Sequence, residues 1–168
     1  YKVLIPHAID QDPYFRLARD ICPKMNQPKP NNLMCKFIPP LSGVEGKMSS
    51  SENTQDSIFL NDSDKEIKKK ISLSFSGSKG SGSLEEHKIF GGNIHTDISC
   101  KYLEIFEEDE EKYLKILEDF SSGKLSCSAI KGILSEKLIK VCSRIRDNKN
   151  SLSDEDILEY FDWDRKLI

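Results

Sequence analysis

The sequence lacks three features that would assign it at once to a broad class of protein. No apolar run approaches the roughly 20 residues that a membrane-spanning helix needs. The opening, Tyr1 to Pro6, has no initiator methionine and no signal-peptide pattern. The net charge is only −3 over 168 residues, so no field of one sign draws the whole molecule onto nucleic acid. Any contact with RNA must therefore come from a local basic patch.

Paired cysteines are also absent. The five cysteines are odd in number, widely spaced and free of any Cys-x-x-Cys pair: Cys22, Cys35, Cys100, Cys127 and Cys142. Zinc and thioredoxin-like chemistry therefore have no support, and we expect reduced thiols packed as small hydrophobic side chains. His87 and His95 have no third ligand at a suitable spacing, so no metal site is predicted.

The pattern of apolar residues changes near residue 60. Residues 1–60 alternate short apolar runs with loops, as α/β proteins do. From residue 61 onward, apolar side chains recur at helical spacing in a chain that is 32% charged and 37% hydrophobic. The sequence therefore predicts an α/β segment over residues 1–60 and an all-α helical domain over residues 61–168.

The α/β segment is expected to contain two strands with a helix between them. Tyr1 to Ile5 is predicted to be a buried strand ended by Pro6, and Leu33 to Ile38 a second strand. Asp10 or Asp12 is a candidate cap for the helix between them. Because the opening strand has no earlier partner, we expect the chain to be a piece of a longer protein.

Six helices are expected in the second part. The first is capped by Asp62 or Ser63, with Ile67, Ile71 and Phe75 on one face. A flexible connector over residues 76–83 follows it, because that stretch is rich in glycine and serine. The other helices are predicted over residues 84–90, 98–106, 111–120 and 126–146 and from residue 153 onward. Buried positions in the longest are expected to be Ile130, Ile133 or Leu134, Leu138, Val141 or Cys142, and Ile145.

The segment from Gly46 to Ser51 (GKMSSS) combines hydroxyl groups with a single lysine. Small residues let backbone N–H groups approach an anion, hydroxyls add donors, and Lys47 supplies positive charge, which together suit a polyphosphate. A Walker P-loop is excluded by spacing, because Met48 follows the lysine and Leu41 occupies the first glycine position. The segment alone leaves a phosphate-binding loop and a solvated linker equally open.

A second polar cluster, Asp10-Gln11-Asp12, lies where the first strand passes into the first helix. In open α/β sheets, ligands bind beyond the carboxyl ends of the strands. The amide carbonyl of Gln11 can accept from an ammonium group, and the aspartates supply negative charge. Alone, the pattern favours capping aspartates and a solvated glutamine, because helix caps are so common.

Together these segments resemble one enzyme family. Residues 46–51 are similar to the KMSKS signature of class I aminoacyl-tRNA synthetases, with Ser50 in place of the second lysine. Residues 4–20 (LIPHAIDQDPYFRLARD), 46–60 and 85–93 (EEHKIFGGN) resemble eukaryotic and archaeal tryptophanyl-tRNA synthetases in order and spacing. Tyrosyl-tRNA synthetases are the nearest competitor.

The resemblance covers nearly the whole chain and implies a fold for each part. Residues 1–60 would be the carboxy-terminal part of a Rossmann-like catalytic domain with its KMSKS-like loop. Residues 61–168 would be the helical anticodon-binding domain. The chain would then be the carboxy-terminal portion of the ligase, inactive by itself, because the HIGH motif and most of the tryptophan pocket would precede Tyr1.

The resemblance also implies roles for single residues. Gln11 matches the residue that holds the ammonium group of tryptophan, and His7 matches a pocket-lining position. The loop residues that match those closing on the ATP phosphates are Lys47, Met48, Ser49, Ser50 and Ser51. Of these, the catalytic assignments are Lys47, Ser49 and Ser51. Lys131 matches a basic position on the anticodon-facing helices.

Lys65, Lys68, Lys69 and Lys70 form the densest basic cluster. A solvated helix face would produce the same pattern, but within this family Lys68 and Lys69 become candidate contacts for the tRNA backbone. The implied cofactors are ATP and Mg²⁺. The implied partners are tryptophan, tRNA(Trp) and a second subunit of a cytoplasmic homodimer. A non-catalytic RNA-binding module and the tyrosine-specific relative stay open as alternatives.

Overall fold

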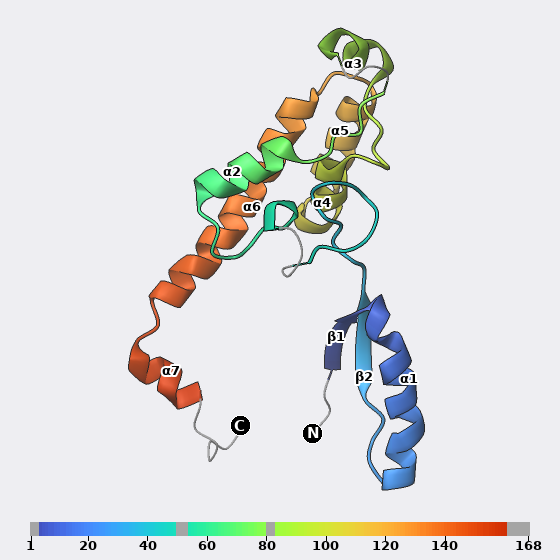
Figure 1. The fold of residues 1–168 in the computed structure, drawn as a ribbon, viewed down its shortest axis with the longest axis vertical. Helices are drawn as coiled ribbons and strands as arrows, with labels where there is room; N and C mark the ends of the chain where they lie inside the picture. Colours follow the sequence, from blue (N-terminus) through green and yellow to red (C-terminus); the bar gives the residue numbers. More distant parts are fainter. Residues whose placement is uncertain (1–3, 50–53, 80–82, 161–168) are drawn as a thin grey trace.

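A computed structural model describes residues 4–49, 54–79 and 83–160 of the protein. Figure 1 shows a small α/β part, drawn at the lower right, and a larger helical part in which α6 is the longest helix labelled. The chain leaves the α/β part after β2 and enters the helical part through a long loop. This loop contains the lysine of the predicted phosphate segment.

The α/β part is a β-α-β unit. Strand β1 (Leu4–Ala8) leads through a 3-10 turn (Ile9–Gln11) into helix α1 (Asp12–Ile21), and strand β2 (Asn31–Cys35) returns parallel to β1. The prediction that Pro6 ends the first strand is wrong, since β1 continues through it to Ala8. Each strand of this two-stranded sheet is an edge, where a residue without an N–H group is tolerated.

The aspartates near the start of α1 do not cap it. Gln11 occupies the N-cap position and makes no capping hydrogen bond with its side chain. Asp12 instead pairs with Arg16 one turn further on, at 2.6 Å, and Asp10 pairs with Lys47. The predicted caps are therefore wrong, because both carboxylates have cationic partners: Asp12 a neighbour one turn away, and Asp10 a lysine distant in sequence.

The helical part contains the six predicted helices. They are α2 (Asp64–Leu73), α3 (Leu84–Phe90), α4 (Ile98–Phe106), α5 (Glu110–Ser121), α6 (Cys127–Asn150) and α7 (Asp154–Tyr160). Helix α2 begins with a capping box, in which Ser63 and Glu66 each bond the other's backbone N–H group. Four more helices start at a residue whose side chain caps the N-terminus: Ser83, Asp97, Asp109 and Ser126.

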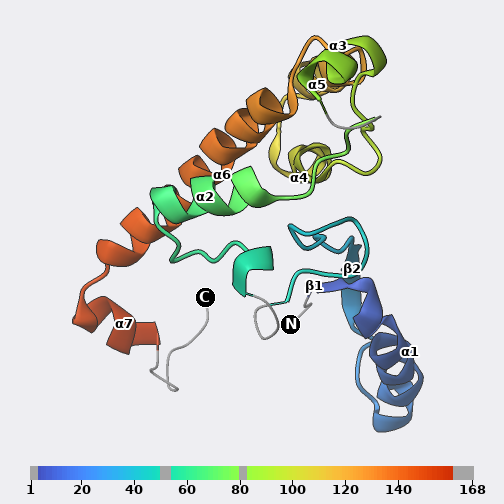
Figure 2. The same ribbon diagram turned by 45° about the horizontal axis from the view of Figure 1, so that its top comes forward.

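One hydrophobic core joins α2, α4, α5 and α6. Helices α2 and α6 lie side by side in both Figure 1 and Figure 2. Buried apolar residues of the core include Ile67, Ile71, Leu103, Phe120, Ile130, Leu134 and Leu138. Two predictions are wrong here: Phe75, expected on one face of the helix with Ile67 and Ile71, lies beyond the end of α2 and is 47% exposed, and Ile145, expected to be buried, is 37% exposed.

The loop after β2 packs against the helical part. Leu41 is buried in the helical core, and its carbonyl accepts a hydrogen bond from the Phe75 N–H group at 2.8 Å. The hydroxyl of Tyr102 in α4 donates to the Pro39 carbonyl at 2.7 Å. The loop is therefore supported by the helices as well as by the strands.

The predicted flexible connector is fixed in part. The Gly77 N–H group donates to Asp97 at 2.9 Å, and the Gly77 carbonyl accepts from Asn93 at 2.6 Å. A Cβ atom at this position would collide with the Asn93 carbonyl, so the contact requires glycine. Residues 80–82 of the connector lie outside the described part.

The expectation that the cysteines are packed as small hydrophobic side chains holds for two of the five. All five cysteines are free, but only Cys100 and Cys142 are buried, and burial raises the pKa of both thiols. Over the described ranges, none of the helices combines the length and apolarity required for a membrane span. The same ranges hold no group of three or more metal-ligating side chains.

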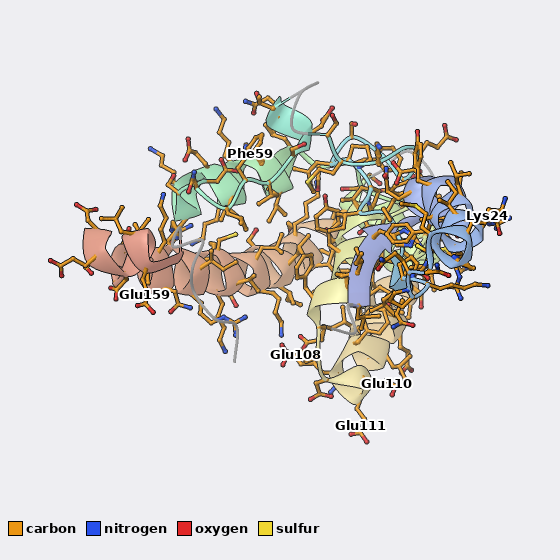
Figure 3. The ribbon with its side chains drawn as sticks, turned by 90° about the horizontal axis from the view of Figure 1, so that it is seen from below. Lys24, Phe59, Glu108, Glu110, Glu111 and Glu159 are labelled. Carbon is orange, nitrogen blue, oxygen red and sulfur yellow. The ribbon has the colours of Figure 1, made fainter. Side chains whose placement is uncertain are left out.

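Glu107 follows α4 directly and contacts lysines from two other helices. Its side chain is 3% exposed, and its oxygens lie 2.9 Å from Lys137 of α6 and 3.0 Å from Lys112 of α5. The hydrogen bond from Lys137, supported by Lys112, lowers the pKa of Glu107 to about 2. Nearby, Glu110 and Glu111 extend into solvent (Figure 3), where the N-terminus of α5 favours negative charge.

Lys137→Met is expected to destabilise the protein more at neutral pH than in acid. A carboxylate with a depressed folded pKa stabilises the fold above its unfolded pKa of about 4.3. That contribution is lost as the pH falls through the folded pKa of about 2. The difference in thermal midpoint between wild type and variant should therefore shrink by roughly half between about pH 7 and about pH 3. A difference independent of pH would contradict this account of Glu107.

Candidate site for phosphate and an amino acid

The carboxyl ends of β1 and β2 bring the two predicted motifs together. The strands are parallel and in register, with Ala8 opposite Cys35 at their ends. Asp10 and Gln11 follow β1 at this edge, and the loop that carries Lys47 follows β2. Such an edge is where open α/β sheets bind ligands.

Lys47 makes the contact that joins the two motifs. Its Nζ atom lies 2.8 Å from Asp10 Oδ2 and 5.6 Å from the centroid of the Phe37 ring. The hydrogen bond from Lys47 lowers the pKa of Asp10, and a hydrogen bond with the Gln11 side chain contributes in the same direction. The lysine of one motif therefore pairs with a carboxylate of the other, at the residue next to Gln11.

This ion pair is open to solvent. The Lys47 side chain is 55% exposed and that of Asp10 34%. Exposed ion pairs contribute little net stability, because water solvates the separated charges well. The ammonium group can therefore exchange Asp10 for a phosphate oxygen at small cost.

A cleft lies beside Lys47. It measures about 310 Å³ and is lined by Pro40, Ser42, Glu45, Gly46, Lys47, Ser49 and Asp56. Gly46 has a positive φ of 87°, a backbone conformation that favours glycine. An ammonium group, hydroxyls and an exposed glycine backbone suit a phosphate chain. Two carboxylates in the same cleft are oxygen ligands of the kind that Mg²⁺ accepts.

Hydrogen bonds fasten the loop on both sides of the cleft. The Met48 N–H group donates to the Ile38 carbonyl at 2.7 Å, and the Leu41 N–H group donates to the backbone carbonyl of Asp56 at 2.9 Å. On the other side, Ser57 Oγ donates to the Ser49 carbonyl at 2.8 Å. The predicted site residues Ser50 and Ser51 lie outside the described part of the chain.

His7 is held between the sheet and α1. Its Nδ1 donates to the Ala8 carbonyl at 2.7 Å, and its Nε2 accepts from the Asn32 amide at 2.8 Å. The ring stacks on Phe15 of α1, with centroids 4.2 Å apart. Both ring nitrogens therefore make protein contacts that position the histidine, and Asn32 is a partner that sequence reasoning missed.

The predicted basic cluster is divided between surface and interior. Lys68 and Lys69 are exposed on α2, as an RNA contact requires, but Lys70 is buried in an ion pair with Asp62. Including Lys70 in a surface cluster is therefore wrong. The helical period turns this position toward the loop and away from solvent.

Lys131 binds the end of α2. Its Nζ atom donates to the Ser72 carbonyl at 3.0 Å and to the Ser74 carbonyl at 2.6 Å. Cations are favoured at helix C-termini, where carbonyls lack partners within the helix. Burial lowers the pKa of this lysine. Lys131 also lines a hollow of about 250 Å³ together with Lys68.

Comparison with known proteins identifies the family. Residues 1–143 match the family described as "tRNA synthetases class I (W and Y)". The chain belongs to this family. The cytoplasmic tryptophan–tRNA ligase of Homo sapiens is 42% identical to this chain over 167 residues, which are 99% of this chain and 35% of that protein. The resemblance predicted from the two motifs is thereby confirmed.

Solved structures of tRNA synthetases also match this chain in fold. A parasite tRNA synthetase in a product-bound form matches this chain with a TM-score of 0.86 and 43% identity, over 95% of this chain and 42% of that one. The tryptophanyl-tRNA synthetase of Giardia lamblia matches with a TM-score of 0.83 and 37% identity, over 92% and 38%. The chain spans about a third of the length of the first curated relatives. Its place at the carboxy-terminal end of a longer ligase stays a prediction.

Several residues that shape the candidate site were given no role from the sequence. Asp56 and Ser42 line the cleft, and Ser57 anchors the loop from the far side. Lys70 donates to the Ser57 carbonyl and pairs with Asp62. Their contacts and their place at the cleft come from the folded chain, because no sequence pattern assigns them.

Proposed function

We propose that this chain is part of a tryptophan–tRNA ligase. The reaction would join tryptophan to ATP, release pyrophosphate from tryptophanyl-adenylate, and transfer the amino acid to tRNA(Trp). The observation that carries the proposal is the ion pair between Lys47 and Asp10, the residue next to Gln11, on the carboxyl edge of two parallel strands. The names of the most similar relatives support tryptophan over tyrosine.

Positioning and fixed charge carry the proposed adenylation. The nucleophile is the α-carboxylate of the amino acid, with a pKa of about 3.5, so it is ionised at neutral pH and needs no general base. The barrier lies in bringing two anions together and in dispersing charge onto departing pyrophosphate. This explains why a catalytic triad is not needed.

Residues of the two motifs would share this work. Lys47 would stabilise charge on the β- and γ-phosphates, and Ser49 and Ser51 would donate hydrogen bonds. Met48 and Ser50 would contribute the backbone between them. When bound with ATP, Mg²⁺ supplies further positive charge to the phosphate oxygens, and Glu45 and Asp56 are the carboxylates nearest the cleft.

Gln11 would hold the amino acid by its ammonium group. The side-chain carbonyl is an acceptor, and the neighbouring Asp10 adds the negative charge that an ammonium favours. Transfer of Lys47 from Asp10 to a phosphate would leave that carboxylate available to the amino acid. His7 would line the pocket from β1 through its contacts with Asn32 and Phe15.

The helical part would read the tRNA. We propose the division predicted from sequence, with a Rossmann-like catalytic part over residues 1–60 and an anticodon-binding part over residues 61–168. Lys68 and Lys69 are exposed and suit phosphate contacts, and Lys131 would act from the adjoining hollow. The full-length enzyme would be a cytoplasmic homodimer, as the human relative's name supports for its location.

A ligase extended upstream from this chain is expected to catalyse ATP–pyrophosphate exchange with tryptophan and far less with tyrosine. Specificity for the larger, apolar indole is a difference between two transition-state affinities, so the two amino acids must be compared at equal enzyme concentration. Exchange with tyrosine alone would assign the chain to the tyrosine-specific relative. RNA binding with no exchange for either amino acid would favour the non-catalytic module.

A further inference from the structure

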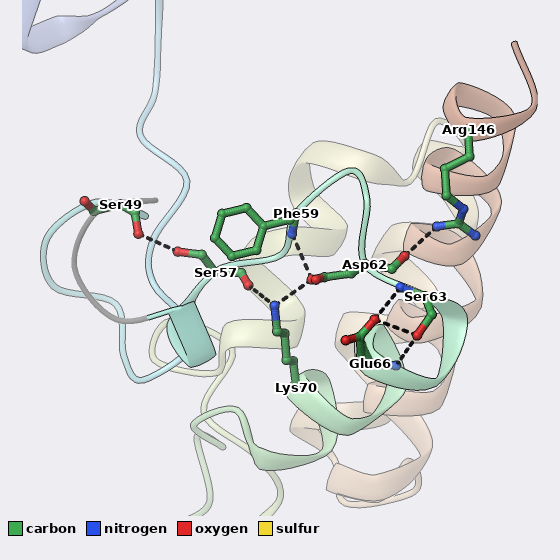
Figure 4. A network of polar contacts seen from close by, with 8 residues as sticks. All are labelled: Ser49, Ser57, Phe59, Asp62, Ser63, Glu66, Lys70 and Arg146. Carbon is green, nitrogen blue, oxygen red and sulfur yellow. Dashed lines mark hydrogen bonds and ion pairs between the residues drawn. The ribbon is translucent and has the colours of Figure 1, made fainter. Parts of the chain in front are cut away.

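A buried ion pair between Lys70 and Asp62 is connected through Ser57 to the loop that carries Lys47 and Ser49 (Figure 4). We call this loop the phosphate loop. Lys70 Nζ of α2 lies 2.6 Å from Asp62 Oδ2, with the two side chains 9% and 11% exposed. The same ammonium donates to the Ser57 carbonyl at 2.9 Å and lies 4.7 Å from the centroid of the Phe59 ring. An ammonium group has three N–H donors, and three partners surround this one. Lys70 is therefore held in one position.

Ser57 connects this ion pair to the loop. Ser57 is 2% exposed, and its hydroxyl donates to the Ser49 carbonyl at 2.8 Å. Its own carbonyl accepts from Lys70. The carbonyl of Ser57 therefore bonds to α2, and its hydroxyl bonds to the loop. Ser49, the acceptor in the loop, is two residues from Lys47.

Asp62 connects the same ion pair to α6. Arg146 of α6 donates to the Asp62 carbonyl at 2.6 Å and pairs with Asp64 at 2.5 Å. The Phe59 N–H group donates to the Asp62 carboxylate at 2.9 Å, which fixes the side chain from the loop side. Figure 4 shows the resulting path from Arg146 through Asp62, Lys70 and Ser57 to Ser49.

We propose that Ser57, Asp62 and Lys70 are positioning residues for adenylation, which hold the phosphate loop at a fixed place relative to α2 and α6. This inference rests on the proposed function. A buried ion pair adds little stability over apolar residues of equal volume, but its directional bonds fix geometry. A loop that must place one ammonium group against a phosphate needs that geometry, because small displacements of reacting groups slow reactions steeply.

The path also links the two parts of the molecule. Helices α2 and α6 carry the proposed tRNA contacts, and the loop carries the proposed ATP contacts. A shift of α6 relative to α2 would move Asp62 through Arg146 and would reach Ser49 through Lys70 and Ser57. The ion pair is therefore one connection through which the helices set the position of Ser49, beside the contacts of Pro39 and Leu41 with the helical part.

Ser57→Ala in the full-length ligase tests the connection with the least disturbance. It removes the hydroxyl that holds Ser49 and keeps the carbonyl that Lys70 uses. We expect kcat for tryptophan-dependent pyrophosphate exchange to fall about fivefold to tenfold, the effect of losing one neutral hydrogen bond. KM for tryptophan should be unchanged. Ser74→Ala is the matched control, because its buried hydroxyl donates to the Ile71 carbonyl within α2.

A double variant tests whether the residues act as one chain. Lys70→Gln should lower kcat further than Ser57→Ala, and adding Ser57→Ala to it should cost little more, because coupled sites are not additive. Equal kcat for Ser57→Ala and Ser74→Ala, or additive losses in the double variant, would overturn this inference. The proposed ligase function would stand in that case, provided that the wild type catalyses exchange. A wild type without exchange would overturn the proposed function and this inference with it. Where Lys70→Gln fails to fold, the two serine variants decide.

Discussion

Lys47→Ala in the full-length ligase is expected to lower the rate of tryptophan-dependent pyrophosphate exchange by about 10²–10³-fold, as loss of a single electrostatic donor does elsewhere. The ammonium group would act on charge that develops on departing pyrophosphate, so the loss should appear in kcat. KM for tryptophan should change little, because the variant leaves Gln11, the proposed contact of the amino acid, in place. Steady-state exchange with varied tryptophan measures both constants.

Lys36→Ala is the matched control for this variant. Lys36 follows β2 as Lys47 does, and its Nζ atom lies 2.8 Å from Glu104, so it also forms an exposed ion pair. It does not line the cleft. Equal exchange rates for the two variants would mean that removal of any exposed ion pair produces the effect, and the role assigned to Lys47 would have to be withdrawn.

Residues that act on their near neighbours could be predicted from sequence. Ser63 and Glu66 stand at the spacing of a capping box, and α2 begins there. The bounds of α3 and α4 were also predictable, because a glycine follows one helix and a capping aspartate precedes the other. Lys47 and Gln11 were singled out from short strings, and the roles assigned to them stay predictions.

Residues that act across the chain could not be predicted in this way. Asp10 looks like a helix cap until the loop brings Lys47 to it, and Lys70 looks like part of a solvated face until Asp62 and Ser57 surround it. Charge and helical spacing alone cannot distinguish an exposed lysine from a buried, paired one. The contacts that position the loop therefore had to come from the structure.

Gly91→Ala is expected to lower the free energy of unfolding by about 2–5 kcal/mol. Gly91 ends α3 with a φ of 69°, which costs other residues about 1–2 kcal/mol. An added Cβ atom would also collide with the Ser121 carbonyl, and displacing packed backbone costs about 1–3 kcal/mol more. In a protein of this size the thermal midpoint should fall by about 5–15 °C.

Gly132→Ala makes the same chemical change with the opposite expected sign. Gly132 lies inside α6, where an added Cβ atom meets nothing within 4 Å. Alanine loses less backbone entropy on folding than glycine, so the variant should gain about 0.5–1 kcal/mol and melt about 2–4 °C higher. A fall in both midpoints would show that glycine is needed in α6 for a reason other than backbone conformation. Opposite shifts would confirm that φ and the Ser121 contact, and not loss of glycine itself, determine the cost at the end of α3.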